Sequence, residues 1–139
     1  MDEFRAAMGI CNLRHIDEYI AVRKQVYEKY LERLSGVQGL YIPIPQKDVT
    51  ANYAYFPVYI NPDLFGKSRD IVFDELATKG IYARKYFYPA INEMSCYKGI
   101  YKNQRTPVAH DISSKILTLP MYEGLSIEDV NRICDIVLE

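Results

Sequence analysis

The sequence predicts an α/β (α+β) fold, a two-layer sandwich in which about four helices pack on a small, mostly antiparallel sheet of about three strands. Segments with helical spacing of apolar residues alternate along the chain with short runs rich in aromatic and branched residues. The chain has 139 residues, 49% of them apolar, which suffices for one globular core and is short for two. We therefore expect a single domain over residues 1–139.

Residues 2–34 are expected to form one long helix, because the segment lacks proline and ends at Ser35-Gly36, where glycine can adopt the left-handed C-terminal position. Its first turns are small or apolar on every side, whereas beyond Asn12 the apolar residues follow a single stripe. A helix that is apolar all round is usually enclosed by neighbours. The rest of this chain offers little to enclose it, so we expect a partner from outside these residues.

The middle of the chain is expected to alternate between strand and helix. Residues 37–50 contain two prolines without a helical period, which indicates an extended connector. The run 53–60 is strand-like, and Pro57 places it at an edge or a bulge. A helix should follow over residues 68–80, from a serine cap to a glycine, and a strand over residues 81–87.

The last part of the chain begins with a long loop over residues 88–105, which has no period and is typical of a functional loop. Thr106-Pro107 should open a short helix, with proline at the first helical position. Residues 116–119 form a compact strand ended by proline, and Ser126 resembles the start of a capping box for the last helix.

Composition argues against several classes of partner. Seventeen basic and eighteen acidic residues leave a net charge of −1, so no attraction to nucleic acid or to an anionic membrane is expected. No run of about 18 apolar residues could span a bilayer, and the N-terminus lacks the pattern of an export signal. Three widely spaced cysteines indicate neither a disulfide framework nor a zinc site. We therefore expect a cytoplasmic protein.

The sequence offers no recognisable catalytic set of its own. His15 and His110 lie in predicted helices, without a serine or cysteine at a spacing that suggests a nucleophile and its base. No glycine-rich phosphate loop is encoded in a recognisable form. We therefore predict no catalytic, cofactor-binding or metal-binding residue in this chain.

The candidate binding residues are Arg84, Lys85, Tyr86 and Tyr88, at the end of the predicted strand 81–87. Arginine and lysine bind phosphate or diphosphate through charge-assisted hydrogen bonds, and tyrosine can stack on or hydrogen-bond a sugar. Because strand residues alternate, Arg84, Tyr86 and Tyr88 should share one face, with Lys85 on the other.

The residues alone allow two other interpretations of this patch. The patch could be a solvated edge strand without a ligand. An RNA-binding sheet also uses aromatic and basic residues, but its pattern needs glycines within the aromatic run, and residues 82–88 contain none.

Three segments carry a family pattern. They are Met1-Asp2-Glu3-Phe4-Arg5-Ala6-Ala7-Met8-Gly9, Gly80-Ile81 with Arg84 and Tyr88-Pro89, and Leu119-Pro120-Met121-Tyr122 followed by Leu125-Ser126. In this order they resemble the C-terminal part of the DegT/DnrJ/StrS family of sugar-nucleotide aminotransferases, which depend on pyridoxal phosphate. Residues 84–89 and 106–109 are most similar to enzymes that aminate a dTDP-4-keto-6-deoxyhexose.

The resemblance implies a parent enzyme with two domains. A large domain carries the Schiff-base lysine and the aspartate that holds the cofactor's pyridinium nitrogen, and a small C-terminal domain has the fold of fold-type I pyridoxal-phosphate enzymes. This chain would be that small domain, and residues 1–36 would bridge to the large one. Because the cofactor contacts belong outside this segment, the chain alone is expected neither to bind pyridoxal phosphate nor to transfer an amino group.

In such enzymes the small domain closes over the active site and helps to hold the nucleotide-sugar substrate, so the resemblance gives Arg84, Tyr86, Tyr88 and then Lys85 a substrate-binding role. The parent would move an amino group from glutamate to a keto-deoxysugar nucleotide, for polysaccharide or O-antigen sugars. A homodimer, or self-association through the first helix, is expected.

The alternative is a stand-alone α/β module that either binds a small molecule or has a regulatory function. The two hypotheses differ over residues 1–11, because a self-sufficient module should not begin with an apolar helix that lacks a partner.

Overall fold

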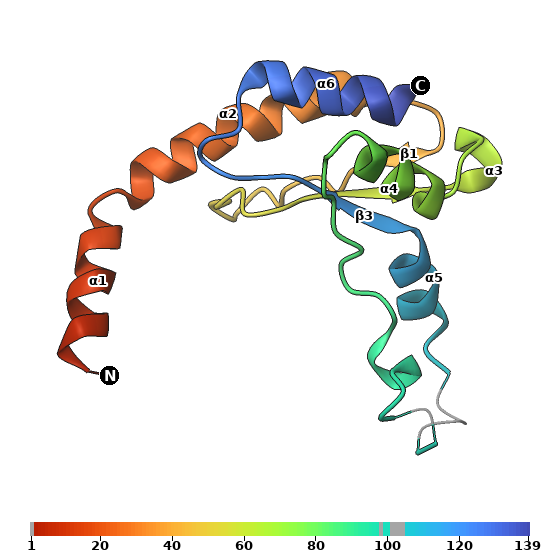
Figure 1. Cartoon of the computed structure of the whole chain (residues 1–139), viewed down its shortest axis with the longest axis horizontal. Helices are drawn as coiled ribbons and strands as arrows, with labels where there is room; N and C mark the ends of the chain where they lie inside the picture. The colour runs from red at the N-terminus through yellow and green to blue at the C-terminus, as the bar shows by residue number, and fades with distance from the viewer. Residues whose placement is uncertain (1, 98, 101–104) are drawn as a thin grey trace.

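The computed structural model describes residues 2–97, 99–100 and 105–139, and it confirms the predicted class of fold (Figure 1). Part of the predicted loop 88–105 lies outside the described residues. The elements in chain order are α1 (Glu3–Leu13), α2 (Ile16–Leu34), β1 (Leu40–Tyr41), β2 (Phe56–Ile60), α3 (Pro62–Phe65), α4 (Arg69–Thr78), the 3-10 turn η1 (Ile91–Glu93), α5 (Pro107–Lys115), β3 (Ile116–Leu119) and α6 (Ile127–Leu138).

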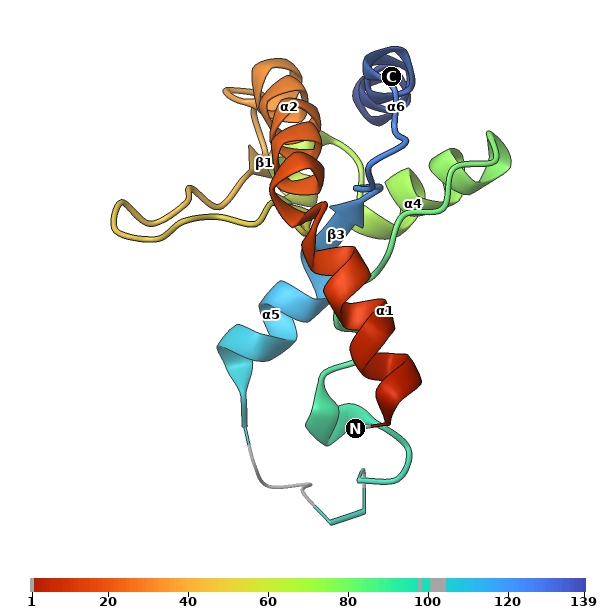
Figure 2. The same cartoon turned by 90° about the vertical axis from the view of Figure 1, so that its left-hand side faces the viewer.

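The sheet is antiparallel, with the strand order β1-β2-β3. Helices α2 and α6 run side by side above it in both views, and α4 packs against α6 (Figures 1 and 2). Burial alternates along β2, whose residues Phe56, Val58 and Ile60 face the core. No helix in the described ranges is both long and apolar enough to cross a bilayer.

Pro57 lies in the central strand, so the prediction that it marks an edge strand or a bulge is wrong. The register explains why proline is tolerated there. Pro57 faces Thr118, whose backbone N–H and C=O both bond to Arg84 on the far side of β3. The backbone nitrogen of Pro57 therefore points toward the β1 side, where β1 pairs only with Tyr59 and Ile60.

The strand predicted over residues 81–87 does not form. Only Arg84 pairs with the sheet: its N–H donates to the Thr118 carbonyl (2.9 Å) and its carbonyl accepts from the Thr118 N–H (2.8 Å). Before it, the Ile81 N–H is taken by the Leu76 carbonyl at the end of α4 (2.9 Å). After it, the chain turns at Tyr86. The third strand of the sheet is β1, which lies in the segment 37–50 that was predicted to be a connector.

The single helix predicted over residues 2–34 is divided in two. The N–H of Arg14 donates to the Cys11 carbonyl (3.3 Å) and that of His15 to the Asn12 carbonyl (3.1 Å), which tightens the turn and ends α1. Helix α1 then runs away from the sandwich instead of continuing along α2 (Figures 1 and 2). It buries no residue, and Phe4 is 79% exposed.

The core lies between the sheet and helices α2, α4 and α6. At its centre the ring of Phe56 stacks on Tyr30, with 4.8 Å between centroids, and meets Tyr27 edge-on at 5.0 Å. The buried Tyr30 hydroxyl donates to the Pro120 carbonyl (3.1 Å), and burial raises the pKa of that phenol. This contact joins α2 to the chain that leaves β3.

Candidate functional site

Residues 84–89 lead from the sandwich into an arm formed by η1 and α5 (Figure 1). The Arg84 side chain is exposed, while its backbone is fixed by the pairing with Thr118. The peptide bonds Tyr86–Phe87 and Tyr88–Pro89 are cis. Because only Arg84 pairs with the sheet and residues 86–87 form a turn, the predicted binding residues lie beside the sheet rather than in a regular strand.

One group of side chains gathers around Tyr86. Its ring stacks on Phe87, with 4.1 Å between centroids, and its hydroxyl lies 3.2 Å from that of Tyr55, just before β2. This hydrogen bond raises the pKa of Tyr55, and the nearby charge of Arg84 opposes that shift. Arg84, Tyr55 and Tyr86 together present one cation and two hydroxyls at the surface.

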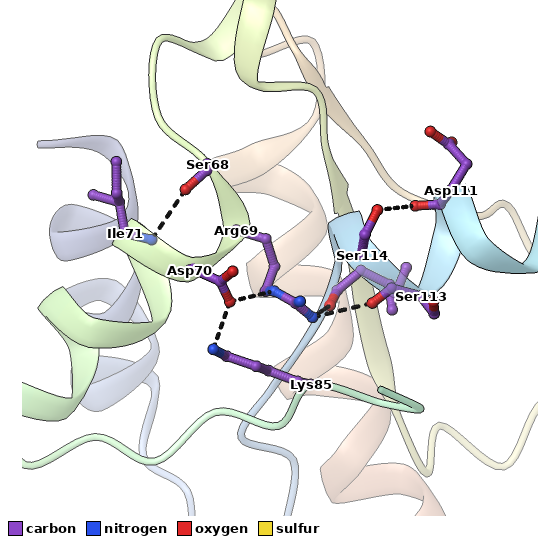
Figure 3. Close-up of polar contacts among 9 residues, drawn as sticks. Ser68, Arg69, Asp70, Ile71, Lys85, Asp111, Ser113 and Ser114 are labelled. Atoms are coloured by element: carbon purple, nitrogen blue, oxygen red, sulfur yellow. Dashed lines mark hydrogen bonds and ion pairs between the residues drawn. The ribbon is translucent and has the colours of Figure 1, made fainter. Parts of the chain in front are cut away.

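Lys85 and Tyr88 belong to a second group, at the N-terminal end of α4. Figure 3 shows Lys85 beside Asp70 and Arg69 in this group. The Lys85 Nζ lies 2.5 Å from Asp70 Oδ1, and the guanidinium carbon of Arg69 lies 4.7 Å from the centre of the Tyr88 ring. The prediction that Tyr88 shares a face with Tyr86 is wrong, because the chain turns at Tyr86 and strand alternation does not continue.

Arg69 is the centre of this second group and is only 2% exposed. Its Nε donates to Asp70 Oδ1 (2.9 Å), and its Nη1 donates to the carbonyls of Ser113 (3.2 Å) and Ile116 (3.1 Å). These bonds tie the start of α4 to the junction of α5 and β3 (Figure 3). They also leave the guanidinium carbon over the ring of Tyr88.

The charge on Asp70 gives this group a pH dependence. The hydrogen bond from Lys85 holds the pKa of Asp70 below its usual value, and the charge of Arg69 adds to this effect. A carboxylate whose pKa falls on folding stabilises the fold above its unfolded pKa, about 3.9, and this stabilisation is lost as the pH falls through the lower folded value.

We expect Asp70→Asn to lower the free energy of unfolding at pH 7 by about 1 kcal/mol or less, since the pair is partly screened by solvent. The difference from the wild type should begin to shrink below about pH 4, where the unfolded carboxyl takes up its proton, and should vanish below the lower folded pKa. Urea titrations at neutral and acid pH check this, with the exposed Asp74→Asn on the same helix as control. A difference that stays constant with pH would contradict the prediction.

Sequence reasoning missed Arg69, Asp70 and Tyr55. Arg69 left one signal, because it occupies the first turn of a predicted helix, where the helix dipole disfavours a cation. A cation in such a place suggests a compensating tertiary partner. Tyr55 and Asp70 carried no comparable signal, because their roles depend on which distant segment lies beside them.

The two histidines have carboxylate neighbours. His110 Nδ1 lies 2.6 Å from Glu93 Oε1, which pins η1 to α5, and His15 Nδ1 lies 3.7 Å from Glu18. An apolar hollow of about 430 Å³ lies between η1 and α5 and is lined in part by Phe87, Ile91 and Ile112. Across the described part of the chain, no group of three or more His, Cys, Asp or Glu residues could hold a metal ion.

Comparisons with known proteins agree on one family. The model of the DegT/DnrJ/EryC1/StrS aminotransferase family matches residues 1–138. A dTDP-4-amino-4,6-dideoxy-D-glucose transaminase of Escherichia coli is 36% identical over 140 residues, covering 99% of this chain and 38% of that protein. A dTDP-4-dehydro-2,3,6-trideoxy-D-glucose 4-aminotransferase of Saccharopolyspora spinosa is 29% identical, covering 96% of this chain and 33% of that protein.

A solved structure has the same fold. The crystal structure of DesI in the presence of its TDP-sugar product matches with a TM-score of 0.91 and 27% identity, covering 99% of this chain and 35% of that chain. The present chain thus spans 33% to 38% of the length of these relatives.

Proposed function

Because the chain belongs to the DegT/DnrJ/EryC1/StrS aminotransferase family, we propose that it is the substrate-side, C-terminal domain of a pyridoxal-phosphate-dependent nucleotide-sugar aminotransferase. The parent enzyme would transfer an amino group from glutamate to a keto-deoxysugar nucleotide. One observation carries the proposal: a match over 99% of this chain covers only 38% of the Escherichia coli transaminase. A reading frame that continues upstream of residue 1 into a lysine-bearing domain would test it directly.

We place the cofactor in the large domain of the parent enzyme, because three of the described lysines are already engaged in ion pairs. A Schiff base to pyridoxal phosphate needs a lysine amine, and Lys85, Lys67 and Lys115 each lie within 2.7 Å of a carboxylate oxygen. For Lys115, the hydrogen bond to Asp111 raises the pKa. In the parent enzyme the cofactor would supply the electron sink, and we assign this chain no step on it.

The contribution of this chain is to hold the substrate. We assign Arg84 to the diphosphate, because its side chain is exposed beside two tyrosine hydroxyls and arginine binds phosphate oxygens in a bidentate manner. Tyr86 and Tyr88 would flank the sugar from the two sides of the turn. Lys85 takes a lesser role, because its ammonium would have to leave Asp70 to reach a phosphate.

We expect Arg84→Ala in the parent enzyme to raise the Michaelis constant for the nucleotide sugar roughly tenfold or more, with little change in kcat, because a charge-assisted hydrogen bond contributes about 1.5–3 kcal/mol. Steady-state kinetics with the sugar nucleotide varied and glutamate saturating measures this. The matched control is Arg132→Ala, an exposed arginine on α6 that bonds the Lys79 carbonyl. An unchanged Michaelis constant would remove Arg84 from the site.

The exposure of α1 argues against the stand-alone module. Phe4, Met8 and Ile10 are each more than half exposed, and such a face on a self-sufficient domain would lie against water. We propose instead that this face packs on the large domain in the parent, and that in the isolated chain it brings two copies together. Sedimentation velocity at rising concentration tests the self-association.

We also propose a cytoplasmic location. Cys11, Cys96 and Cys134 carry no disulfide, which suits a reducing compartment.

A further inference from the structure

We propose that Arg69 is a positioning residue for the substrate-side segment, residues 84–89. It would act directly on Tyr88. By way of Asp70 it would also act on Lys85 (Figure 3). The inference rests on the substrate-binding function proposed for that segment. Arg69 itself lies behind the segment and is not a ligand.

The burial of Arg69 requires an explanation. A guanidinium that is 2% exposed has lost its hydration, which is costly unless its donors are satisfied. Asp70 and the carbonyls of Ser113 and Ile116 accept from Nε and Nη1, at 2.9 to 3.2 Å. Because these acceptors come from two different parts of the chain, the plane of the guanidinium is fixed.

The fixed plane gives Tyr88 a defined place. The guanidinium carbon lies 4.7 Å from the ring centre, within the distance at which a cation is attracted to an aromatic face. Tyr88 is 52% exposed, so solvent contact alone would leave its ring several orientations. The stack on Arg69 favours one of them.

Asp70 extends the same control to Lys85. Its Oδ1 accepts from Arg69 Nε and also contacts Lys85 Nζ, so one carboxylate oxygen joins both cations. The ammonium of Lys85 also lies 4.3 Å from the centre of the Phe73 ring. The residues on either side of the Tyr86–Phe87 turn are therefore both held by the first turns of α4.

A competing hypothesis limits the role of Arg69 to its hydrogen bonds with the backbone carbonyls of Ser113 and Ile116. In that case the guanidinium would serve only to satisfy the junction of α5 and β3, and Tyr88 would lie over it without being oriented by it. The two roles predict different responses to substitution, because Ser113 and Ile116 are distant in sequence from residues 84–89.

Two-dimensional NMR of the ¹⁵N-labelled 139-residue chain separates these roles. We expect Arg69→Lys, which keeps the charge and loses the flat fork, to shift the amide resonances of Lys85 and Tyr88 while those of β2 and α6 stay in place. The control Arg132→Lys should leave residues 84–89 unchanged. Shifts confined to residues 113–116 would overturn the proposal.

A substitution on the other side of the contact keeps the proposal testable if Arg69→Lys fails to fold. Tyr88→Leu alters an exposed side chain and should move the side-chain Nε–H resonance of Arg69, since the ring current of the tyrosine is lost. An unmoved Arg69 resonance would overturn the proposal even if Arg69→Lys were unfolded.

Titration with dTDP-glucose separates this inference from the proposed function. If both are right, the probe shifts the resonances of residues 84–88 in the wild type, and Arg69→Lys weakens its apparent affinity roughly three- to tenfold. If the probe shifts no resonance in the wild type while Arg69→Lys still displaces Lys85 and Tyr88, the substrate function fails and the positioning by Arg69 stands. Equal affinity of the wild type and Arg69→Lys would overturn the positioning.

Discussion

Pyridoxal phosphate and glutamate, added to the 139-residue chain, are expected to give neither an aldimine absorbance nor amino transfer to a keto-sugar nucleotide. The chain spans only 38% of the Escherichia coli transaminase, and we propose that the lysine that forms the Schiff base lies in the part of the parent enzyme that this match does not cover. Since enzymes typically accelerate their reactions by 10⁶-fold or more, the expected loss relative to an intact relative is the whole of that factor.

The measurement is an absorbance titration with pyridoxal phosphate, followed by an amino-transfer assay. The cofactor is kept at micromolar concentration, so that non-specific imines with surface lysines do not accumulate. The Escherichia coli transaminase that shares 36% identity serves as the positive control in the same buffer. A stoichiometric aldimine formed by the chain alone would refute the assignment of the cofactor site to another domain.

Phe56→Ala is expected to lower the free energy of unfolding by about 3–5 kcal/mol, through lost burial and the cavity left behind. Phe56 is fully buried in the central strand, and its ring contacts both Tyr27 and Tyr30 of α2. A domain of this size has a total stability of about 5–15 kcal/mol, so the variant should be close to unfolding at room temperature.

Urea unfolding followed by far-ultraviolet circular dichroism measures the effect. The control is Phe87→Ala, which removes the same ring from a position that is 71% exposed and should change stability by about 0.5 kcal/mol or less. Similar losses in the two variants would mean that Phe56 is not part of the core that holds α2 on the sheet.

The features that depend on nearby residues were predictable from the sequence. Ser68 accepts from the Ile71 N–H and Ser126 from the Asp129 N–H, as capping residues should, so α4 and α6 begin where they were expected. Helix α5 begins at Pro107 as predicted, although the Thr106 side chain makes no capping bond. The strand β3 ends before Pro120 for the same local reason.

The features that depend on distant residues were not predictable in this way. The break between α1 and α2 falls at Arg14 and His15, which no propensity scale marks as a helix end. Strand β1 exists because its two residues meet Ile60 and Tyr59, and residues 81–87 fail as a strand because the end of α4 claims the Ile81 N–H. Both outcomes are settled by tertiary pairing.

The candidate site also has one part that nearby residues make predictable and one part that depends on distant residues. The residue types in Arg84, Lys85, Tyr86 and Tyr88 are visible in the sequence, and they stay our proposed substrate contacts. Their division into two groups is not visible, because it follows from the turn at Tyr86 and from the buried Arg69. The residue types of the candidate segment were therefore predictable, whereas the contact of Arg69 with Tyr88 was not.

The shortness of the sheet bears on how copies of this chain can aggregate. Strand β1 has two residues and β3 has four, and Arg84 already occupies the free edge of β3 at Thr118. Amyloid-like growth needs a long, open row of backbone donors and acceptors, which these edges do not supply. Clustering at high concentration should therefore proceed through apolar side chains and reverse on dilution, without seeding fibrils.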